Sequence, residues 1–231
     1  PDLYKRGVRN FVVSDLPKDL NGYEDANFLQ LPHPLKGLQR LAEKHRERFD
    51  VPVVGITGSN GKTIVKEWLY QLLSPERIIT RSPRSYNSQI GVPLSVWLMN
   101  ESTELGIFEA GISEMGEMEA LKNIIRPSIG VLTNIGGAHQ ENFYSVEDKC
   151  IEKLALFKDC DVVIYDGDNE LISRCISKSL FSAREIAWSR KDSERPLYIE
   201  SVTKDVSSTT IRYRYLGMPN AYTIPFIDDA S

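Results

Sequence analysis

From residue 51 onward, the chain alternates short apolar runs with polar or glycine-containing stretches, each followed by a segment of helical periodicity. The apolar runs lack a polar residue at every second position, which is typical of strands buried on both faces of a parallel sheet. These runs are Val53 to Thr57, Leu105 to Glu109, Ile129 to Asn134 and Asp161 to Tyr165. Strands that alternate with helices predict an α/β fold, with a mostly parallel sheet flanked by helices.

Helices are predicted between these strands by apolar residues that recur at helical spacing. One helix extends from Ile64 to Leu73, and a second follows Ser113, whose hydroxyl we expect to cap it. The second helix carries Met115, Met118, Leu121 and Ile125 on one face. We interpret its methionines as packing residues. A third helix begins at Ser145.

The C-terminal stretch has a different pattern, in which apolar and polar residues alternate. Strands are predicted at Leu197 to Val202, Thr209 to Leu216 and Tyr222 to Ile227. In the second strand, one face carries Ile211, Tyr213 and Tyr215, and the other carries Arg212 and Arg214. This alternation predicts a small antiparallel appendage to the parallel sheet.

The N-terminal segment contains fewer predicted elements. Two strand-like runs, Asn10 to Ser14 and Asn27 to Leu31, precede a helix with Leu35, Leu38, Leu41 and Ala42 on one face. A segment this short cannot bury a core of its own. We therefore interpret residues 1–49 as part of a neighbouring domain and residues 50–231 as the main domain.

The composition restricts the class of protein. A chain of 231 residues with 41% hydrophobic residues can bury a full core. Its net charge of -4 gives no general attraction to nucleic acid or to an anionic membrane, so neither is expected as a partner. No apolar run approaches the length of about 18 residues that spans a membrane, and the N-terminus lacks the features of a signal peptide.

Cysteine usage and the ends of the chain add two expectations. Cys150, Cys160 and Cys175 are odd in number and lack a CxxC spacing, which predicts free thiols in a reducing compartment, the cytoplasm. The first methionine is Met99, and the chain stops shortly after a strand-like run. We therefore expect the sequence to be a piece of a longer protein.

A candidate phosphate-binding loop follows the first buried strand, in the sequence VPVVGITGSNGKT of residues 51–63. The loop consists of Gly58, Ser59, Asn60 and Gly61. Its glycines let backbone N–H groups turn toward an anion, and the N-terminus of the next helix adds positive potential. Lys62 can reach the terminal phosphates of a nucleotide, and the hydroxyl of Thr63 can bind Mg²⁺.

The loop departs from the strict Walker pattern, which would place a glycine where Ile56 stands. Gly55 lies one residue too early for that position. An ordinary glycine turn between a strand and a helix is therefore the alternative.

Polar residues also follow the neighbouring strands. Glu109 ends its strand, and Asn134 ends the next one and is followed, after glycines and an alanine, by His139. Ligands of open parallel sheets lie at the carboxyl ends of the strands, so these side chains should converge on the loop. A carboxylate and an imidazole suit a magnesium-nucleotide site better than a zinc site. The alternatives are a solvated charge for Glu109 and a capping or turn role for His139.

Five motifs resemble, in order and spacing, the central ATPase domain of the Mur ligases. They are GITGSNGKT, RSYNSQIGVPLSVW, FEAGISEMGEMEAL, PSIGVLTNIGGAHQENFYSVED and EKLALF. The resemblance is closest to the branch that adds D-alanyl-D-alanine to a UDP-muramoyl tripeptide, near the form fused to an alanine racemase. It implies that residues 1–49 end an N-terminal substrate domain and that a C-terminal domain is missing.

The resemblance also implies a role for each candidate residue. The loop from Gly58 to Thr63, together with Asn134, would bind ATP. Thr63 and Glu109 would be ligands of one Mg²⁺, and His139 would be a ligand of a second. Tyr86, Asn87 and Ser88 fall in the loop that faces the UDP-muramoyl peptide, with a plain turn as the alternative.

Lys153 matches a lysine that is carbamylated in the family and then serves as a metal ligand. Carbamylation requires a neutral amine, so the pKa of Lys153 would have to be depressed by burial or by nearby cations. Without the resemblance, Lys153 would be interpreted as a solvated helix lysine. Ala155 stands where the family has a glutamate, so the match of this helix is imperfect.

The implied activity is that of an ATP-dependent amide-bond ligase that works through an acyl phosphate. Lys62, Lys153 and His139 would be its catalytic residues. Lys62 would supply positive charge itself and the other two would hold Mg²⁺, because cations are needed to offset the repulsion between carboxylate and phosphate. We expect the chain by itself to bind nucleotide weakly and not to turn over. The alternatives are a folylpolyglutamate synthase, a plain P-loop NTPase and a non-catalytic nucleotide-binding module.

Overall fold

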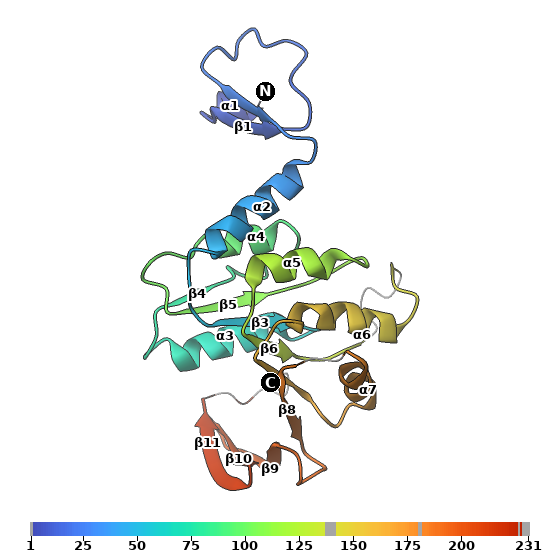
Figure 1. Cartoon of the computed structure of the whole chain (residues 1–231). Coiled ribbons are helices and arrows are strands. Elements are labelled where there is room, and N and C mark those ends of the chain that lie inside the picture. Colours follow the sequence, from blue (N-terminus) through green and yellow to red (C-terminus); the bar gives the residue numbers. More distant parts are fainter. Residues whose placement is uncertain (1, 137–141, 180–181, 226, 228–231) are drawn as a thin grey trace.

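A nine-stranded sheet forms the centre of the chain (Figure 1). The structure is a computed structural model that describes residues 2–136, 142–179, 182–225 and 227. The strands lie in the order β11-β10-β9-β8-β7-β6-β3-β5-β4. Their bounds are β3 Val53–Thr57, β4 Ile79–Arg81, β5 Leu105–Glu109, β6 Ile129–Leu132, β7 Val162–Asp166, β8 Arg184–Ser189, β9 Leu197–Lys204, β10 Thr209–Tyr215 and β11 Met218–Ile224.

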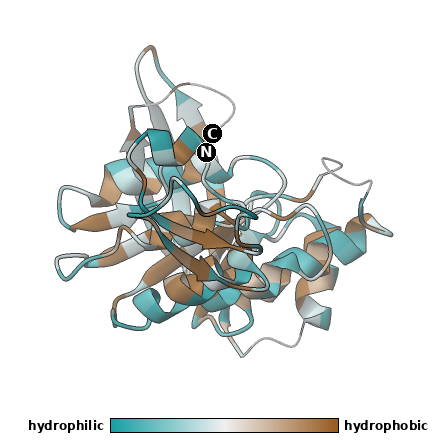
Figure 2. Cartoon of the chain, turned by 90° about the horizontal axis from the view of Figure 1, so that it is seen from above, coloured by the Kyte–Doolittle hydropathy of each residue, from teal (hydrophilic) through white to brown (hydrophobic). Residues whose placement is uncertain are grey.

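Helices cover both faces of the sheet, as the predicted α/β fold requires (Figure 1). They are α3 Lys62–Leu73, α4 Gly91–Val96, α5 Glu117–Ile125, α6 Val146–Leu154 with the 3-10 turn η2 Ala155–Phe157, and α7 Glu170–Lys178. Successive residues of a strand point to opposite faces, which divides the core into two clusters. Val53 and Phe108 pack in the cluster that includes α5 and α6, whereas Val54 and Ile107 pack against α3. Figure 2 shows the central strands as the most hydrophobic part of the molecule.

The N-terminal segment forms a second, smaller sheet. The strands β1 Asn10–Val13 and β2 Asn27–Gln30 are parallel, and α1 Asp2–Lys5 precedes them. Helix α2 Pro34–Arg46 leads from this sheet to the main one and packs against α4 and α5 (Figure 1). Gln39 of α2 donates to the side chain of Gln89 at 2.9 Å. The division of the chain into domains at residues 1–49 and 50–231 stays a prediction.

Some predicted boundaries are confirmed and others are wrong by one or more residues. The bounds of β3 and β5 agree with the prediction, and Ser145 caps α6 by accepting a hydrogen bond from the Asp148 N–H. Ser113 does not cap α5, whose N-cap is Gly116 with φ of 83°. The buried carboxylate of Glu152 accepts the N–H groups of Gly116 and Met118 instead, so a residue remote in sequence caps this helix.

The C-terminal strands pair with one another as predicted and are appended to the main sheet. β9, β10 and β11 are antiparallel to one another, while β9 pairs in parallel with β8 and so continues the main sheet. The last strand was predicted at Tyr222 to Ile227, which is wrong, because it begins at Met218. Leu216 and Gly217 adopt positive φ of 50° and 80°, which makes a tight hairpin and starts β11 immediately.

The elements α1, β4, α4, η2, β8 and α7 were not predicted from the sequence. None of the described helices is long and apolar enough to cross a membrane. All three cysteines are buried and free, as predicted.

One packing contact of the sheet can be tested directly. An added Cβ at Gly130 of β6 would lie 2.4 Å from a ring carbon of the buried Phe157. Because overpacking forces neighbours to move, Gly130→Ala should lower the free energy of unfolding by about 1–3 kcal/mol, measured by urea denaturation. In the double variant Gly130→Ala/Phe157→Leu, part of that loss should be recovered. An unchanged unfolding midpoint for Gly130→Ala would contradict this packing.

Candidate functional site

The loop after β3 has the geometry that a phosphate-binding loop needs. Gly58 has φ of 145°, and a Cβ there would lie 2.0 Å from Thr133 Oγ1, so only glycine fits. Gly61 has φ of 80° and is the N-cap of α3. The first N–H groups of a helix have no partner within the helix, so those of Lys62 and Thr63 are available to an anion.

The stretch that follows β6 holds the loop in place. The N–H of Ser59 donates to Asn134 O at 2.9 Å, and the N–H of Asn60 donates to Asn134 Oδ1 at 3.0 Å. Ser59 Oγ accepts from the Gly136 N–H at 2.9 Å. Asn134 was predicted to bind the cofactor, and in the structure its side chain supports the loop. β6 ends at Leu132 rather than Asn134 because the chain turns here toward the loop.

Glu109 at the end of β5 is fully buried, so the alternative of a solvated strand-end charge is wrong. Strand pairing places it beside Ile56, two residues before the loop. Its Oε2 accepts hydrogen bonds from Thr63 Oγ1 at 3.0 Å and from Asn87 Nδ2 at 3.3 Å. Its Oε1 accepts no hydrogen bond from the described residues but lies 3.0 Å from Lys66 Nζ, in an ion pair.

These atoms are suited to a magnesium ion. Thr63 Oγ1 and Glu109 Oε2 are neighbouring hard oxygen donors, which Mg²⁺ prefers, and it commonly completes its coordination with water and phosphate. Among the described residues, no group of three or more His, Cys, Asp or Glu side chains could hold a metal by itself. His139, the other predicted magnesium ligand, lies outside the described residues.

A cavity of about 460 Å³ opens beside the loop. Three lysines line it, together with residues of the loops after β3, β4 and β5. The lysines are Lys62, Lys149 and Lys153. Three converging ammonium groups favour an anionic ligand in this cavity.

Lys62 begins α3 and is half-buried rather than exposed. Its Nζ donates to Gly58 O at 2.8 Å, so the side chain folds back over the loop. Burial lowers the pKa of Lys62, and the charge of Lys149 adds to this, while Glu109 acts in the opposite direction.

Lys153 is only 3% exposed, so the alternative of a solvated helix lysine is wrong. Burial lowers its pKa to about 7, and the charges of Lys62 and Lys149 contribute further. A substantial fraction of this amine is therefore neutral near pH 7. This is the condition that carbamylation requires.

Lys149 is a site residue that the sequence analysis missed. It lies one turn before Lys153 on α6, is buried, and donates from Nζ to Gly136 O at 2.8 Å. Burial lowers its pKa as well. Its spacing of four residues from Lys153 was the available signal, because such residues share a helix face.

The predicted substrate loop is only partly at the cavity. Asn87 and Ser88 line it, whereas Tyr86 is exposed and is not among the lining residues. The backbone of Tyr86 packs against Gly91, where a Cβ would lie 2.9 Å away. Asn87 therefore has two roles in the structure, since it also donates to Glu109.

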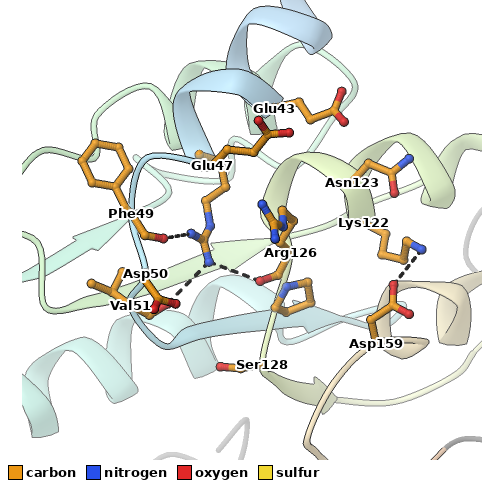
Figure 3. A pocket seen from close by; sticks show the side chains of 12 residues that line it. Glu43, Glu47, Phe49, Asp50, Val51, Lys122, Asn123, Arg126, Ser128 and Asp159 are labelled. Carbon is orange, nitrogen blue, oxygen red and sulfur yellow. Dashed lines mark hydrogen bonds and ion pairs between the residues drawn. The ribbon is translucent and has the colours of Figure 1, made fainter.

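A second cavity, of about 710 Å³, lies at the amino-terminal end of the central strands, where β3 and β6 begin (Figure 3). Its charged groups are largely engaged within the protein. Arg46 donates to the backbone oxygens of Ile125 and Phe49, and Lys122 donates to Asp159 at 2.9 Å. Both lysine-to-carboxylate pairing and backbone contacts therefore occupy cationic groups of this cavity, and we do not assign it the anionic ligand.

The Mur ligase middle domain family matches residues 56–226 of the chain. The chain belongs to the Mur ligase family.

Individual relatives agree with this assignment. The UDP-N-acetylmuramoyl-tripeptide--D-alanyl-D-alanine ligase of Bacillus subtilis is 35% identical over 146 residues, which cover 62% of this chain and 32% of that protein. A crystal structure of MurF from Acinetobacter baumannii has a TM-score of 0.85 at 18% identity, covering 99% of this chain and 49% of that one.

A third similar protein was solved with a nucleotide. The MurF ligase of Thermotoga maritima, in complex with ADP, has a TM-score of 0.81 at 22% identity and covers 95% of this chain and 50% of that one. These structures share the fold of this Mur ligase domain. The chain spans about half the length of the solved MurF chains and a third of the Bacillus subtilis ligase.

The depressed pKa of Lys153 predicts a pH dependence of stability. In the unfolded chain the amine has its ordinary pKa near 10.5, so between about pH 7 and pH 10.5 the unfolded state binds more protons than the folded state. The stability contribution of Lys153 is therefore fully present above about pH 10.5 and is lost as the pH falls through about 7.

The measurement is the free energy of unfolding by urea for wild type and Lys153→Met, in buffers free of carbon dioxide. The difference, wild type minus variant, should rise by on the order of 2 kcal/mol between pH 7.5 and pH 9.5. Groups that do not interact with Lys153 cancel from this difference. A difference that stays flat over this range would show that the pKa of Lys153 is not depressed.

Proposed function

We propose that the chain is the central nucleotide-binding part of an ATP-dependent ligase that adds D-alanyl-D-alanine to a UDP-muramoyl tripeptide. ATP would convert the terminal carboxylate of the tripeptide into an acyl phosphate and leave as ADP. The amine of D-alanyl-D-alanine would then attack the acyl carbon, giving an amide and inorganic phosphate. The relatives' named activity supports this reaction.

One observation carries the proposal: a buried carboxylate and a lysine-lined cavity both adjoin the glycine loop and the start of the helix that follows it. Glu109 bonds to Thr63 within the protein, while Lys62, Lys149 and Lys153 face the cavity. A triphosphate on the loop would present its charge to these lysines. Joining a carboxylate to a phosphoryl group brings two anions together, so clustered positive charge is the chief requirement of the first step.

Mg²⁺ would be held by Thr63 and Glu109, and it would supply charge stabilisation to the transferring phosphoryl group. Lys62 would leave the carbonyl of Gly58 to bind the terminal phosphates. The backbone N–H groups of Gly61 to Thr63 would bind the phosphates, with Ser59, Asn60 and Asn134 fixing the loop. His139 is proposed as a further metal ligand on the resemblance alone.

On the substrate side, Asn87 and Ser88 are proposed to face the muramoyl peptide, since both line the cavity. The small sheet and α2, within residues 1–49, are proposed to be the end of the UDP-substrate domain. The cytoplasm is the proposed location, which agrees with three free and buried cysteines.

The first test is nucleotide binding by Lys62→Ala. Because Lys62 is half-buried at the start of a helix and its Nζ bonds to backbone oxygens of its own loop, its removal should cost little stability but weaken binding of magnesium-ATP about tenfold or more. The readouts are the thermal shift and the titration calorimetry of each protein with magnesium-ATP. Binding is measured rather than turnover, because the chain spans half of its relatives.

The matched control is Lys158→Ala, which removes an exposed lysine just beyond η2. This control should retain wild-type binding. Equal thermal shifts with ATP for wild type and Lys62→Ala would argue against the phosphate loop. Binding of folate in preference to the UDP-muramoyl tripeptide would favour a folylpolyglutamate synthase instead.

Carbamylation of Lys153 is proposed from its burial and lowered pKa. In buffer with ¹³C-labelled bicarbonate, the wild-type protein should show a carbamate carbon signal by NMR, and Lys153→Gln should lack it. Lys149→Gln is the informative comparison, because this lysine is also buried in the same cavity. A signal that persists in Lys153→Gln would assign the carbamate elsewhere.

A further inference from the structure

Lys66 of α3 is a buried cation that neither the loop motif nor the proposed mechanism uses. Its side chain is 0% exposed. Its Nζ lies 3.0 Å from Glu109 Oε1 and 3.1 Å from Glu67 Oε1. It also donates to two backbone oxygens, those of Ser82 at 2.9 Å and of Arg84. These oxygen atoms come from the adjacent residue of α3, from the end of β5 and from the loop after β4.

The two carboxylate oxygens of Glu109 have different partners. Oε1 faces Lys66, and Oε2 faces Thr63 and Asn87. A carboxylate rotates freely when neither oxygen is held. The ion pair with Lys66 therefore sets which oxygen points toward the phosphate loop.

The same ammonium fixes the loop that leads from β4 to the cavity. Its bonds to Ser82 and Arg84 hold this loop, and Arg84 has the unusual φ of 48°. Ser82 Oγ in turn accepts the N–H of Glu109 at 3.2 Å. Asn87, a few residues further on, is thereby brought within reach of the Glu109 carboxylate.

Stability alone gives no reason for this arrangement. Replacing a buried ion pair by apolar residues of similar volume is often neutral or stabilising, so such pairs are weak evidence for a purely structural role. Lys66 also lies close to the two atoms that we assign to the metal, and groups that orient metal ligands affect metal affinity strongly.

We propose that Lys66 is a positioning residue of the nucleotide site, which holds Oε1 of Glu109 and so presents Oε2, beside Thr63, to the magnesium ion of a bound nucleotide. This proposal rests on the proposed function. Lys66 does not touch the nucleotide. It acts through the orientation of Glu109.

The test compares binding of the ATP analogue AMP-PCP by wild type and Lys66→Met, with and without magnesium chloride, by titration calorimetry. Magnesium should tighten binding to the wild type. In Lys66→Met, this enhancement should shrink by about 10- to 100-fold, while the magnesium-free affinity stays the same. A merely structural role would lower both affinities, and that result would overturn the proposal.

Two further variants make the experiment specific. Glu109→Gln should lose the magnesium enhancement, and the double variant Lys66→Met/Glu109→Gln should lose no more, because both changes act through one carboxylate. Lys122→Met, which breaks an ion pair with Asp159 at the far edge of the sheet, should bind as wild type does.

The outcomes separate the two proposals. If the wild type shows no magnesium-dependent binding of AMP-PCP, the proposed function fails. If the wild type shows it and Lys66→Met retains it, only the role of Lys66 fails. Should Lys66→Met not fold because its Glu109 carboxylate is buried without a cation, Glu109→Gln is compared with the double variant. The double variant has no such carboxylate. Weaker AMP-PCP binding by the double variant than by Glu109→Gln would then overturn the role of Lys66.

Discussion

A carboxylate without any exposed surface, at the tip of β5, is the constraint on which the site depends. Removing a charged group from water costs several kcal/mol unless other groups compensate. Compensation for Glu109 comes from Lys66 and Thr63 of α3 and from Asn87 of the loop after β4. These groups meet only when α3 has docked on the sheet and the loop has folded. The phosphate loop, which begins α3, is placed by the same docking.

Positively charged side chains gather at the cavity beside the loop. Lys62, Lys149 and Lys153 come from two helices, and burial lowers the pKa of each. Their mutual repulsion disfavours the site when it is empty and is relieved when a polyanion binds. The buried Glu109 is thus paired with Lys66, whereas the three cavity lysines place positive charge beside the loop. This arrangement suits a nucleotide that carries its own cation.

The parts of this site that could be predicted are those encoded locally. The loop glycines, Lys62 and Thr63 are consecutive, and Glu109 was found because strand ends converge in a parallel sheet. Lys66, Lys149 and Glu152 were missed because their burial depends on partners remote in sequence. In the fold, β3 and β5 were predicted with correct ends, since long apolar runs specify buried strands. A strand as short as β4 shows no periodicity.

The hydrogen bond between the side chains of Gln39 and Gln89 connects the N-terminal sheet to the wall of the cavity. Gln89 lines the cavity and also donates to the backbone of α5 at Glu117, while Gln39 belongs to the helix that carries the small N-terminal sheet. A tilt of α2 would therefore also displace Gln89, which lines the cavity. The orientation of the N-terminal sheet and the shape of the cavity wall are thus linked through one hydrogen bond between glutamine side chains.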